Sequence, residues 1–310
     1  MKIICPDPNN FSNKAKSFLK AKFDLTLCSP SEFLNQKSLA DFDCLLIRFN
    51  TIVDENIINK LKNLQFILCP TTGLDHIDID IVKKRGIKII SLKGDIDFLR
   101  NITSTAELAF LLILSSSRKI NISFDEVNKG NWNTNIKPGN ELKSKTIGIL
   151  GLGRLGKIVA SYAKCFGMKV YYYDIEEKKI DKDYEKVNSL RELIKVSDIL
   201  SIHIPLNVET ENLIGENQFK YFGKCKYIIN TSRGAIINQK ALIKYMDRNS
   251  NFHAALDVLE DERNPNNPLI EYSLKNKNLI ITPHIGGNTI EAIENTDMHV
   301  INKFLKEIVL

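Results

Sequence analysis

Hydrophobic and polar positions in the first ninety residues alternate between short apolar runs and stretches with helical spacing. Phe11, Ala15, Leu19 and Phe23 recur with the spacing of one helix face, which predicts an amphipathic helix between two strands. Short strands that alternate with helices are typical of a parallel sheet, so we expect a small parallel α/β layer here. Its five strands are predicted at residues 2–5, 24–27, 44–47, 65–68 and 87–90.

The pattern then changes to a long apolar helix, predicted over residues 104–120, in which Ser104 and Glu107 have the spacing of a capping box. A polar stretch rich in turn-forming residues follows at 130–142. Strands and helices then alternate again, and the residues from Asn288 onward predict one amphipathic helix. The strands of this second alternation are predicted at residues 145–150, 169–174, 199–204, 226–230, 253–257 and 278–282.

This organisation predicts an α/β fold of two doubly wound parallel-sheet domains. The 310 residues are enough for about two domains, and the six strands of the second alternation are the number in a Rossmann fold. We expect this Rossmann domain at residues 101–284. Because the terminal helix is far from its own strand, we expect it to return to the first half. Residues 1–100 and 285–310 would then form a flavodoxin-like domain that contains the Rossmann domain as an insertion.

The charge and cysteine content exclude some classes of function. The chain has 43 basic and 37 acidic residues, a net charge of +6, and its lysines are interleaved with acidic residues. This pattern favours a solvated lysine-rich surface over a nucleic-acid partner. The six cysteines form no CxxC pair, and several lie in or beside apolar runs. They are typical of buried free thiols, so we expect neither a metal site nor disulfides.

The sequence gives no indication of export or of a membrane. The N-terminal residues lack the apolar core of a signal peptide. No apolar run reaches the ~18 residues that a membrane span requires. We therefore expect a cytoplasmic protein without a membrane partner.

A glycine-rich turn, Gly151-Leu152-Gly153-Arg154-Leu155-Gly156, follows the strand predicted at 145–150 and opens a predicted helix. This context is what the dinucleotide-binding fingerprint requires. Gly151 allows the tight turn, Gly153 lets a pyrophosphate approach the backbone, and Gly156 lets helix and strand pack closely. The helix N-terminus would offer N–H groups to the phosphates.

Asp174 ends the next predicted strand, 18 positions after Gly156. A carboxylate there can accept a hydrogen bond from a ribose 2′-hydroxyl. A 2′-phosphate would meet the negative charges of Asp174, Glu176 and Glu177, so NAD is favoured over NADP as the cofactor. The alternative is a strand-end aspartate beside a glycine turn that binds no ligand.

Three polar residues follow strand ends in the second half: Arg233, Glu262 and His284. An arginine can bind a carboxylate through two hydrogen bonds and polarise a carbonyl. A histidine can transfer the proton that accompanies a hydride, and a neighbouring carboxylate can orient it. Each residue alone could be an ordinary surface arginine, solvated glutamate or capping histidine. Together they predict the reduction of a 2-keto acid by NADH.

With these motifs the chain resembles the NAD-dependent D-isomer-specific 2-hydroxyacid dehydrogenase family, whose members include phosphoglycerate dehydrogenases, glyoxylate/hydroxypyruvate reductases and D-lactate dehydrogenases. The resemblance extends over nearly the whole length and ends with the terminal helix, so it implies a short form without the regulatory domain of many phosphoglycerate dehydrogenases. The matching stretches are residues 71–80, 104–114, 130–132, 145–157, 203–215, 229–238, 255–262 and 281–289.

The resemblance implies roles for individual residues. Arg233 would orient the substrate, His284 would be the acid/base and Glu262 its partner. Gly73 and Leu74 would bind the substrate carboxylate through backbone N–H groups, and Arg48 matches an arginine of the family's substrate loop. Implied cofactor contacts, besides the three glycines, come from Arg154, Leu155, Asp174, His203, Pro205, Thr210, Thr231, Ser232 and Asp257.

The resemblance also implies a homodimer. The apolar helix at 104–114 and Trp132 are candidate interface elements, although Trp132 could equally be a packing residue. Substrate would enter between the two domains, and a hinge would close them.

The sequence departs from the family pattern at Thr71, where a glycine is usual, at Arg263, where a proline is usual, and over residues 91–107. The substrate therefore stays open between 3-phosphoglycerate and the hydroxypyruvate/glyoxylate type, since Arg48, Lys93 and Arg100 could serve a phosphate. An NAD-sensing corepressor or scaffold and a phosphite dehydrogenase-like enzyme are the alternatives.

Overall fold

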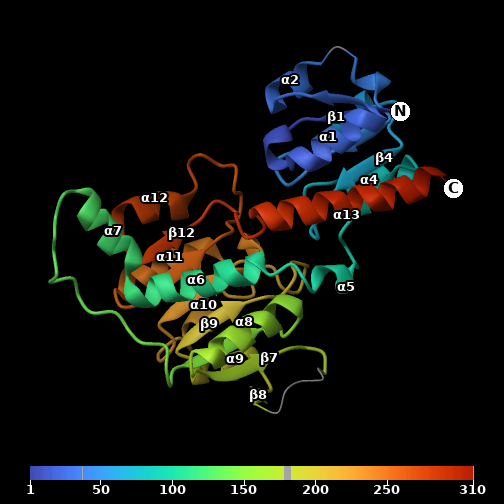
Figure 1. The fold of residues 1–310 in the computed structure, drawn as a ribbon. Coiled ribbons are helices and arrows are strands. Elements are labelled where there is room, and N and C mark those ends of the chain that lie inside the picture. The colour runs from blue at the N-terminus through green and yellow to red at the C-terminus, as the bar shows by residue number, and fades with distance from the viewer. Residues whose placement is uncertain (37, 178–182, 310) are drawn as a thin grey trace. The chain divides into compact units, whose positions relative to one another are not determined.

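Figure 1 shows the computed structural model, which describes residues 1–36, 38–177 and 183–309. The chain divides into two compact units. Unit 1 comprises Met1–Ile102 and Asn288–Leu310, and unit 2 comprises Thr103–Gly287. Unit 2 is therefore an insertion in the sequence of unit 1, and each unit is described by itself below.

The sheet of unit 1 has five parallel strands in the order β2-β1-β3-β4-β5, which is the order of flavodoxin-like folds. All five were predicted, each within one residue of its observed bounds. Because the strands are parallel, the loops that follow β3 and β4 leave the sheet at the same edge. The strands are β1 (Lys2–Cys5), β2 (Asp24–Leu27), β3 (Cys44–Leu46), β4 (Phe66–Cys69) and β5 (Lys88–Ser91).

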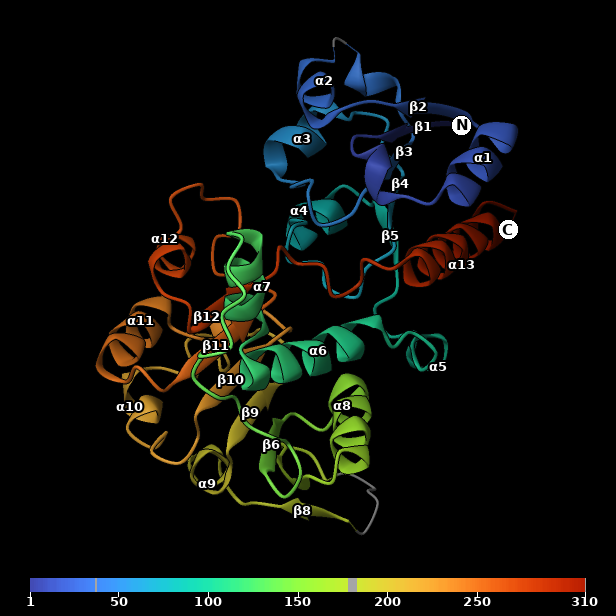
Figure 2. The same cartoon turned by 60° about the vertical axis from the view of Figure 1, so that its left-hand side comes forward.

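Helices cover both faces of this sheet (Figure 2). Phe304 of the last helix is fully buried against the strands with Leu19 of the first helix, so the C-terminal segment completes the core of unit 1. Ser12 caps the first helix by accepting a hydrogen bond from the N–H of Ala15. One face carries α2 (Pro30–Asn35), α3 (Glu55–Lys60) and α4 (Ile79–Lys84), the other α1 (Asn13–Lys22) and α13 (Ile290–Val309), and α5 (Ile96–Leu99) follows β5.

The sheet of unit 2 has seven parallel strands in the order β12-β11-β10-β9-β6-β7-β8. Six of them form the Rossmann order and β12 extends it. The sequence predicts every strand except β8, whose three residues, Tyr-Glu-Lys, are polar and lie at the sheet edge. The strands are β6 (Thr146–Leu150), β7 (Lys169–Tyr173), β8 (Tyr184–Lys186), β9 (Ile199–Ile202), β10 (Tyr227–Asn230), β11 (His253–Leu256) and β12 (Leu279–Ile281).

This sheet is also covered on both faces, so the expectation of two doubly wound parallel-sheet units is confirmed. Buried apolar residues of α6 (Ser104–Arg118) and α8 (Arg154–Cys165) pack on one face. The helices that contribute to the other face are α9 (Leu190–Val196), α10 (Glu216–Phe219), α11 (Gln239–Arg248) and α12 (Pro268–Lys275), while α7 (Ile120–Asn128) follows α6 in the chain.

The long apolar helix begins where predicted, but the capping box is wrong. Ser104 is already the first helical residue, and Thr103 precedes it. The carboxylate of Glu107 accepts a hydrogen bond from the Thr103 hydroxyl at 2.5 Å instead of capping the backbone. Within the described ranges, no helix is long and apolar enough to cross a membrane.

Candidate active site

The turn between β6 and α8 has the geometry that the glycine pattern predicts. Gly151 has a φ of +89°, and a Cβ there would lie 2.8 Å from the carbonyl oxygen of His203. A Cβ on Gly156 would lie 2.1 Å from the carbonyl oxygen of Gly151. At Gly153, by contrast, a Cβ would meet no atom within 4 Å. The turn is thus tightly packed at Gly151 and Gly156 and open at Gly153. The helix α8 begins directly after Gly153, at Arg154, so the N–H groups of its first turn lie beside this open side.

Asp174, directly after β7, is tied to this turn. Its Oδ2 accepts a hydrogen bond from the N–H of Leu152 at 2.8 Å, and its Oδ1 accepts one from the N–H of Glu176 at 2.9 Å. Each carboxylate oxygen can accept more than one hydrogen bond. The carboxylate is therefore held beside the glycine turn, as an acceptor for a ribose hydroxyl would have to be.

The loops after β9 and β10 carry the other predicted cofactor residues except Asp257, which follows β11, and β9 and β10 pair side by side. The Nε2 of His203 lies 2.8 Å from the Ser201 hydroxyl, and burial lowers the pKa of His203 to about 4. Two buried atoms, the Nδ1 of His203 and the Oγ1 of Thr231, have no hydrogen-bond partner among the described residues. Because such groups are costly to leave unsatisfied, they fit a polar ligand at this edge of the sheet.

The remaining predicted cofactor residues of these loops have hydrogen-bond partners within the unit. The Ser232 hydroxyl donates to the carbonyl oxygen of Ile202 at 2.7 Å, which links the ends of β9 and β10. The Thr210 hydroxyl donates to the carbonyl oxygen of Pro205 at 2.7 Å and so closes its own loop. With the open turn and the orphaned atoms, these residues fit a bound dinucleotide.

His284 and Glu262 form a hydrogen-bonded pair. The Nδ1 of His284 lies 2.8 Å from the Oε2 of Glu262, and the other oxygen of this carboxylate accepts from the N–H of Leu259 at 3.3 Å. The side chains are 24% and 37% exposed. The glutamate thus fixes the imidazole ring while leaving the pair accessible to solvent, as the predicted acid/base function requires.

Asp257 holds the backbone of the loop that carries His284. The carboxylate accepts hydrogen bonds from the Thr282 hydroxyl at 2.6 Å and from the N–H groups of Ile285 and Gly286 at 2.8 Å each. His284 has a φ of +53°, a conformation that is rare outside glycine. Burial raises the pKa of Asp257, and its hydrogen bonds oppose that effect. Sequence reasoning assigned Asp257 to the cofactor and missed that it holds the histidine loop.

Arg233 follows β10, next to the strand that precedes Glu262. The Asn230 side chain accepts from the N–H of Ser232 and donates to the carbonyl oxygen of Arg233, both at 2.9 Å. A Cβ on Gly234 would lie 1.9 Å from the carbonyl carbon of Leu259, so the Arg233 loop packs directly on the Glu262 loop. Sequence reasoning missed Asn230, whose signal is a buried amide at a strand end.

The three predicted catalytic residues follow β10, β11 and β12, which are neighbours in the sheet. Unit 2 therefore brings Arg233, Glu262 and His284 to the edge that also carries the glycine turn. No cluster of metal-ligating side chains occurs in the part of the chain that the structure describes.

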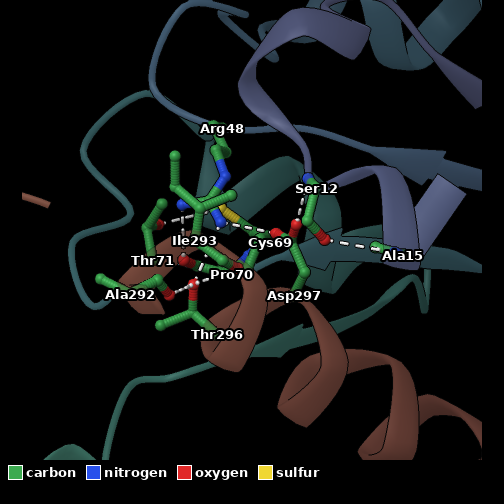
Figure 3. A network of polar contacts seen from close by, with 10 residues as sticks. All are labelled: Ser12, Ala15, Arg48, Cys69, Pro70, Thr71, Ala292, Ile293, Thr296 and Asp297. Carbon is green, nitrogen blue, oxygen red and sulfur yellow. Dashed lines mark hydrogen bonds and ion pairs between the residues drawn. The ribbon is translucent and has the colours of Figure 1, made fainter. Parts of the chain in front are cut away.

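Of the predicted substrate residues, Arg233 and His284 belong to unit 2, whereas Arg48, Gly73 and Leu74 belong to unit 1. Gly73 and Leu74 lie in the loop that joins β4 to α4, in its first part, residues 70–74 (the 70–74 loop). Arg48, after β3, is only 13% exposed, and its Nη2 lies 2.5 Å from the Oδ1 of Asp297 on α13 (Figure 3). The charge of Arg48 is thus compensated inside unit 1, and its proposed contact with substrate stays a prediction.

Residues 110–286 match the family described as D-isomer specific 2-hydroxyacid dehydrogenase, NAD binding domain. The chain belongs to this family. It is 34% identical over 272 residues to a hydroxypyruvate reductase of Thermotoga maritima, covering 88% of this chain and 87% of that protein. It is also 34% identical to a D-3-phosphoglycerate dehydrogenase of Bacillus subtilis, covering 89% of this chain but 53% of that protein.

Comparison with solved structures agrees with this family assignment. The crystal structure of D-lactate dehydrogenase from Aquifex aeolicus, complexed with NAD and lactic acid, matches with a TM-score of 0.79 and 27% identity. The match covers 99% of this chain and 96% of that one. Membership confirms the predicted class, an NAD-dependent oxidoreductase of 2-hydroxy acids.

Proposed function

We propose that the protein interconverts a short, unphosphorylated 2-keto acid and its 2-hydroxy acid, in the D form where that product is chiral, with glyoxylate and hydroxypyruvate as the leading substrates. The observation that carries this proposal is the His284–Glu262 pair at 2.8 Å, held at the same sheet edge as Arg233 and the glycine turn. NAD, when bound, accepts the hydride from the hydroxy acid or NADH supplies it to the keto acid.

His284 is the proposed proton donor and acceptor. Since its Nδ1 is bonded to Glu262, the Nε2 is the nitrogen that exchanges a proton with the substrate oxygen. Asp257 keeps the backbone of the histidine loop in place during this exchange, through three hydrogen bonds. Glu262 keeps the ring from rotating, as an orienting carboxylate does in other acid/base sites.

Arg233 and the 70–74 loop are the proposed substrate-binding groups. A guanidinium has donors arranged to bind a carboxylate and to polarise a neighbouring carbonyl. The backbone N–H groups of Gly73 and Leu74 would receive the carboxylate as well. For the cofactor, we propose the glycine turn and the predicted residues of the loops after β7, β9, β10 and β11.

The preference for an unphosphorylated substrate comes from the arginines that could have served a phosphate. Arg48 is engaged with Asp297, and Arg100 lies 3.2 Å from the carboxylate of Asp97. A phosphate would have to compete with the buried Asp297 carboxylate for Arg48, whereas the exposed Asp97 holds Arg100 only weakly. Lys93 is exposed after β5, so Lys93→Ala should leave the turnover of glyoxylate unchanged.

The test is a screen of NADH oxidation with glyoxylate, hydroxypyruvate, pyruvate and 3-phosphohydroxypyruvate. We expect kcat/KM to be highest for glyoxylate or hydroxypyruvate. A higher value for 3-phosphohydroxypyruvate would contradict the substrate assignment. If no 2-keto acid were reduced, a cofactor-sensing or phosphite-oxidising role would replace the proposal.

We further propose a cytoplasmic homodimer. Trp132 is 87% exposed, and Phe124 and Val127 of α7 are also largely exposed, so the α7 region presents apolar surface that a second copy could cover. Light scattering should give twice the chain mass for the native protein and a shift toward monomer for Trp132→Ser. A monomeric native protein would contradict this assignment. The reducing cytoplasm suits the five cysteines that are buried as free thiols.

A further inference from the structure

The 70–74 loop of unit 1 is held at its carbonyl oxygens by three different donors. The Nη1 of Arg48 donates to Pro70 at 3.3 Å. The N–H of Leu92 donates to Thr71 at 3.1 Å. The Thr71 hydroxyl donates to Gly73 at 2.7 Å. The loop therefore has its carbonyl groups fixed toward the interior of the unit or toward itself.

Fixing a carbonyl group also fixes the N–H group of the next residue, because both belong to one peptide. A trans peptide is planar, and its N–H points opposite to its C=O. The bond from Thr71 to the Gly73 carbonyl therefore turns the N–H of Leu74 away from Thr71. Within the residues that the structure describes, the N–H groups of Gly73 and Leu74 donate no hydrogen bond. The Leu74 N–H therefore has a set direction, and the Gly73 N–H, which belongs to the Thr72–Gly73 peptide, is its neighbour in the chain. Two neighbouring N–H groups suit a carboxylate.

Arg48 reaches this loop from a buried ion pair (Figure 3). Its Nη2 donates to the Asp297 carboxylate at 2.5 Å and to the Thr296 hydroxyl at 3.0 Å, both on α13. The other oxygen of Asp297 accepts from the N–H of Ser12 at 2.7 Å, and its side chain is 1% exposed. The rigid, planar guanidinium can bond α13 and the Pro70 carbonyl at once, which a lysine ammonium on its flexible chain would not reproduce.

We propose that Arg48 and Thr71 are positioning residues, which orient the Gly73–Leu74 peptide group to receive the substrate carboxylate. This inference rests on the proposed function, since it requires a carboxylate substrate. It gives Arg48 a role that differs from direct contact with substrate. It also gives a purpose to Thr71, one of the positions where the sequence departs from the common family pattern.

The first test compares Thr71→Val with Thr71→Ser. Valine has nearly the shape of threonine but no hydroxyl, whereas serine keeps the hydroxyl. We expect Thr71→Val to lower kcat/KM for the best 2-keto acid by roughly tenfold, mainly through KM, and to weaken inhibition by oxamate, an unreactive carboxylate analogue. Thr71→Ser should stay within about twofold of the native enzyme. Equal values for the two variants would overturn the role of Thr71.

The second test compares Arg48→Lys with Asp297→Asn, each measured for KM, kcat and the affinity for NADH. A positioning role predicts that both variants raise KM, because either change releases the Pro70 carbonyl from its donor. If Arg48 instead bound the substrate directly, Asp297→Asn would leave the Arg48 guanidinium available to the substrate, and KM would fall. That result would overturn the inference. NADH affinity should change less than about twofold, since the glycine turn belongs to unit 2.

Phe304→Leu is the matched control for stability. Phe304 lies on α13 and packs on Phe23 and Phe66, away from the Arg48 network. The Phe304→Leu variant should have a Tm as low as that of Asp297→Asn but an unchanged KM. A proportional rise of KM in this control would show that loosening α13 is sufficient, and would overturn the specific role of Arg48.

Hydrogen exchange followed by mass spectrometry provides a readout that needs no turnover. Peptides that span residues 70–78 should exchange faster in Arg48→Lys and Asp297→Asn than in Phe304→Leu. Unchanged exchange would overturn the inference even if activity fell. If the native enzyme reduced no 2-keto acid, the proposed function would be overturned, and this inference with it. If the native enzyme were active and the Arg48 and Thr71 variants had its kinetic constants, only the inference would be overturned.

Discussion

The two sheets present chemically different groups at their carboxyl edges. Unit 2 places ionisable side chains there, and the His284–Glu262 pair is partly exposed. In unit 1, Arg48 at this edge is buried against Asp297, while the N–H groups of Gly73 and Leu74 in the adjacent loop donate no hydrogen bond within the described residues. One parallel-sheet architecture can thus provide reactive side chains in one unit and fixed backbone donors in the other.

The difference between the two units is tested most directly at His284. Replacing it with alanine removes the proton-transfer group, so kcat should fall roughly 10³-fold while Tm changes little. Glu262→Gln keeps a hydrogen-bonding side chain and should cost less, about 10–100-fold. Steady-state kinetics and thermal unfolding of both variants check this. A His284→Ala enzyme with native turnover would show that unit 2 does not supply the acid/base group.

Gly234 tests whether the side chains of unit 2 depend on loop packing. A Cβ at this position would lie 1.9 Å from the carbonyl carbon of Leu259, so Gly234→Ala must push the Arg233 loop away from the Glu262 loop. We expect a loss in kcat/KM of roughly tenfold or more and a Tm lower by several degrees, about what an overpacked site costs. Gly223→Ala, where a Cβ meets nothing within 4 Å, is the control and should behave as native.

Acid should destabilise unit 2 through two histidines. The pKa values of His203 and His253 are about 4, lowered by burial and, at His253, also by Lys119 and Lys137. In the unfolded chain they return to about 6.5, so between these values the unfolded state binds more protons. The free energy of unfolding therefore falls as the pH drops through this window.

Urea unfolding near pH 7 and near pH 5 measures this effect. His203→Gln together with His253→Gln should flatten the pH dependence between these values, by up to about 1.4 kcal/mol per pH unit for each histidine. His299→Gln, in unit 1, is the comparison variant, since this imidazole lies 3.0 Å from the Asp95 carboxylate. An undiminished slope in the double variant would assign the acid sensitivity to other groups.

The smallest effect is expected at the surface of unit 1. Lys14 and Glu294 join α1 to α13 at 2.7 Å, but both side chains are exposed. Such pairs contribute about 0–1 kcal/mol, so Glu294→Gln should change Tm by no more than about two degrees. Asp297→Asn on the same helix should lower it distinctly more, because it leaves Arg48 buried without its charge partner. Equal decreases in Tm for the two variants would contradict the expectation that the buried pair stabilises unit 1 more than the surface pair.

The sequence was sufficient for the positions of the described strands other than β8, and for the residues of unit 2 that follow the strand ends. Strand ends in a parallel sheet meet at one edge, so the sequence alone is enough to predict that Glu262 and His284 lie close together. The pairing of Arg48 could not be predicted, since Asp297 lies 249 positions away in the chain. Strand β8 was missed because it has no apolar run to signal it. The support given by Asn230 and Asp257 depends on buried hydrogen bonds that local patterns do not encode.

The position of α13 after unit 2 in the chain has a consequence for biosynthesis. The strands of unit 1 are made first, but Val300, Ile301 and Phe304 complete their core only after all of unit 2 has been synthesised. Unit 2 is continuous and can fold as soon as it leaves the ribosome. Until α13 has been made, only α1 covers this face of the unit 1 sheet, so the first unit to begin synthesis is the last to complete its core.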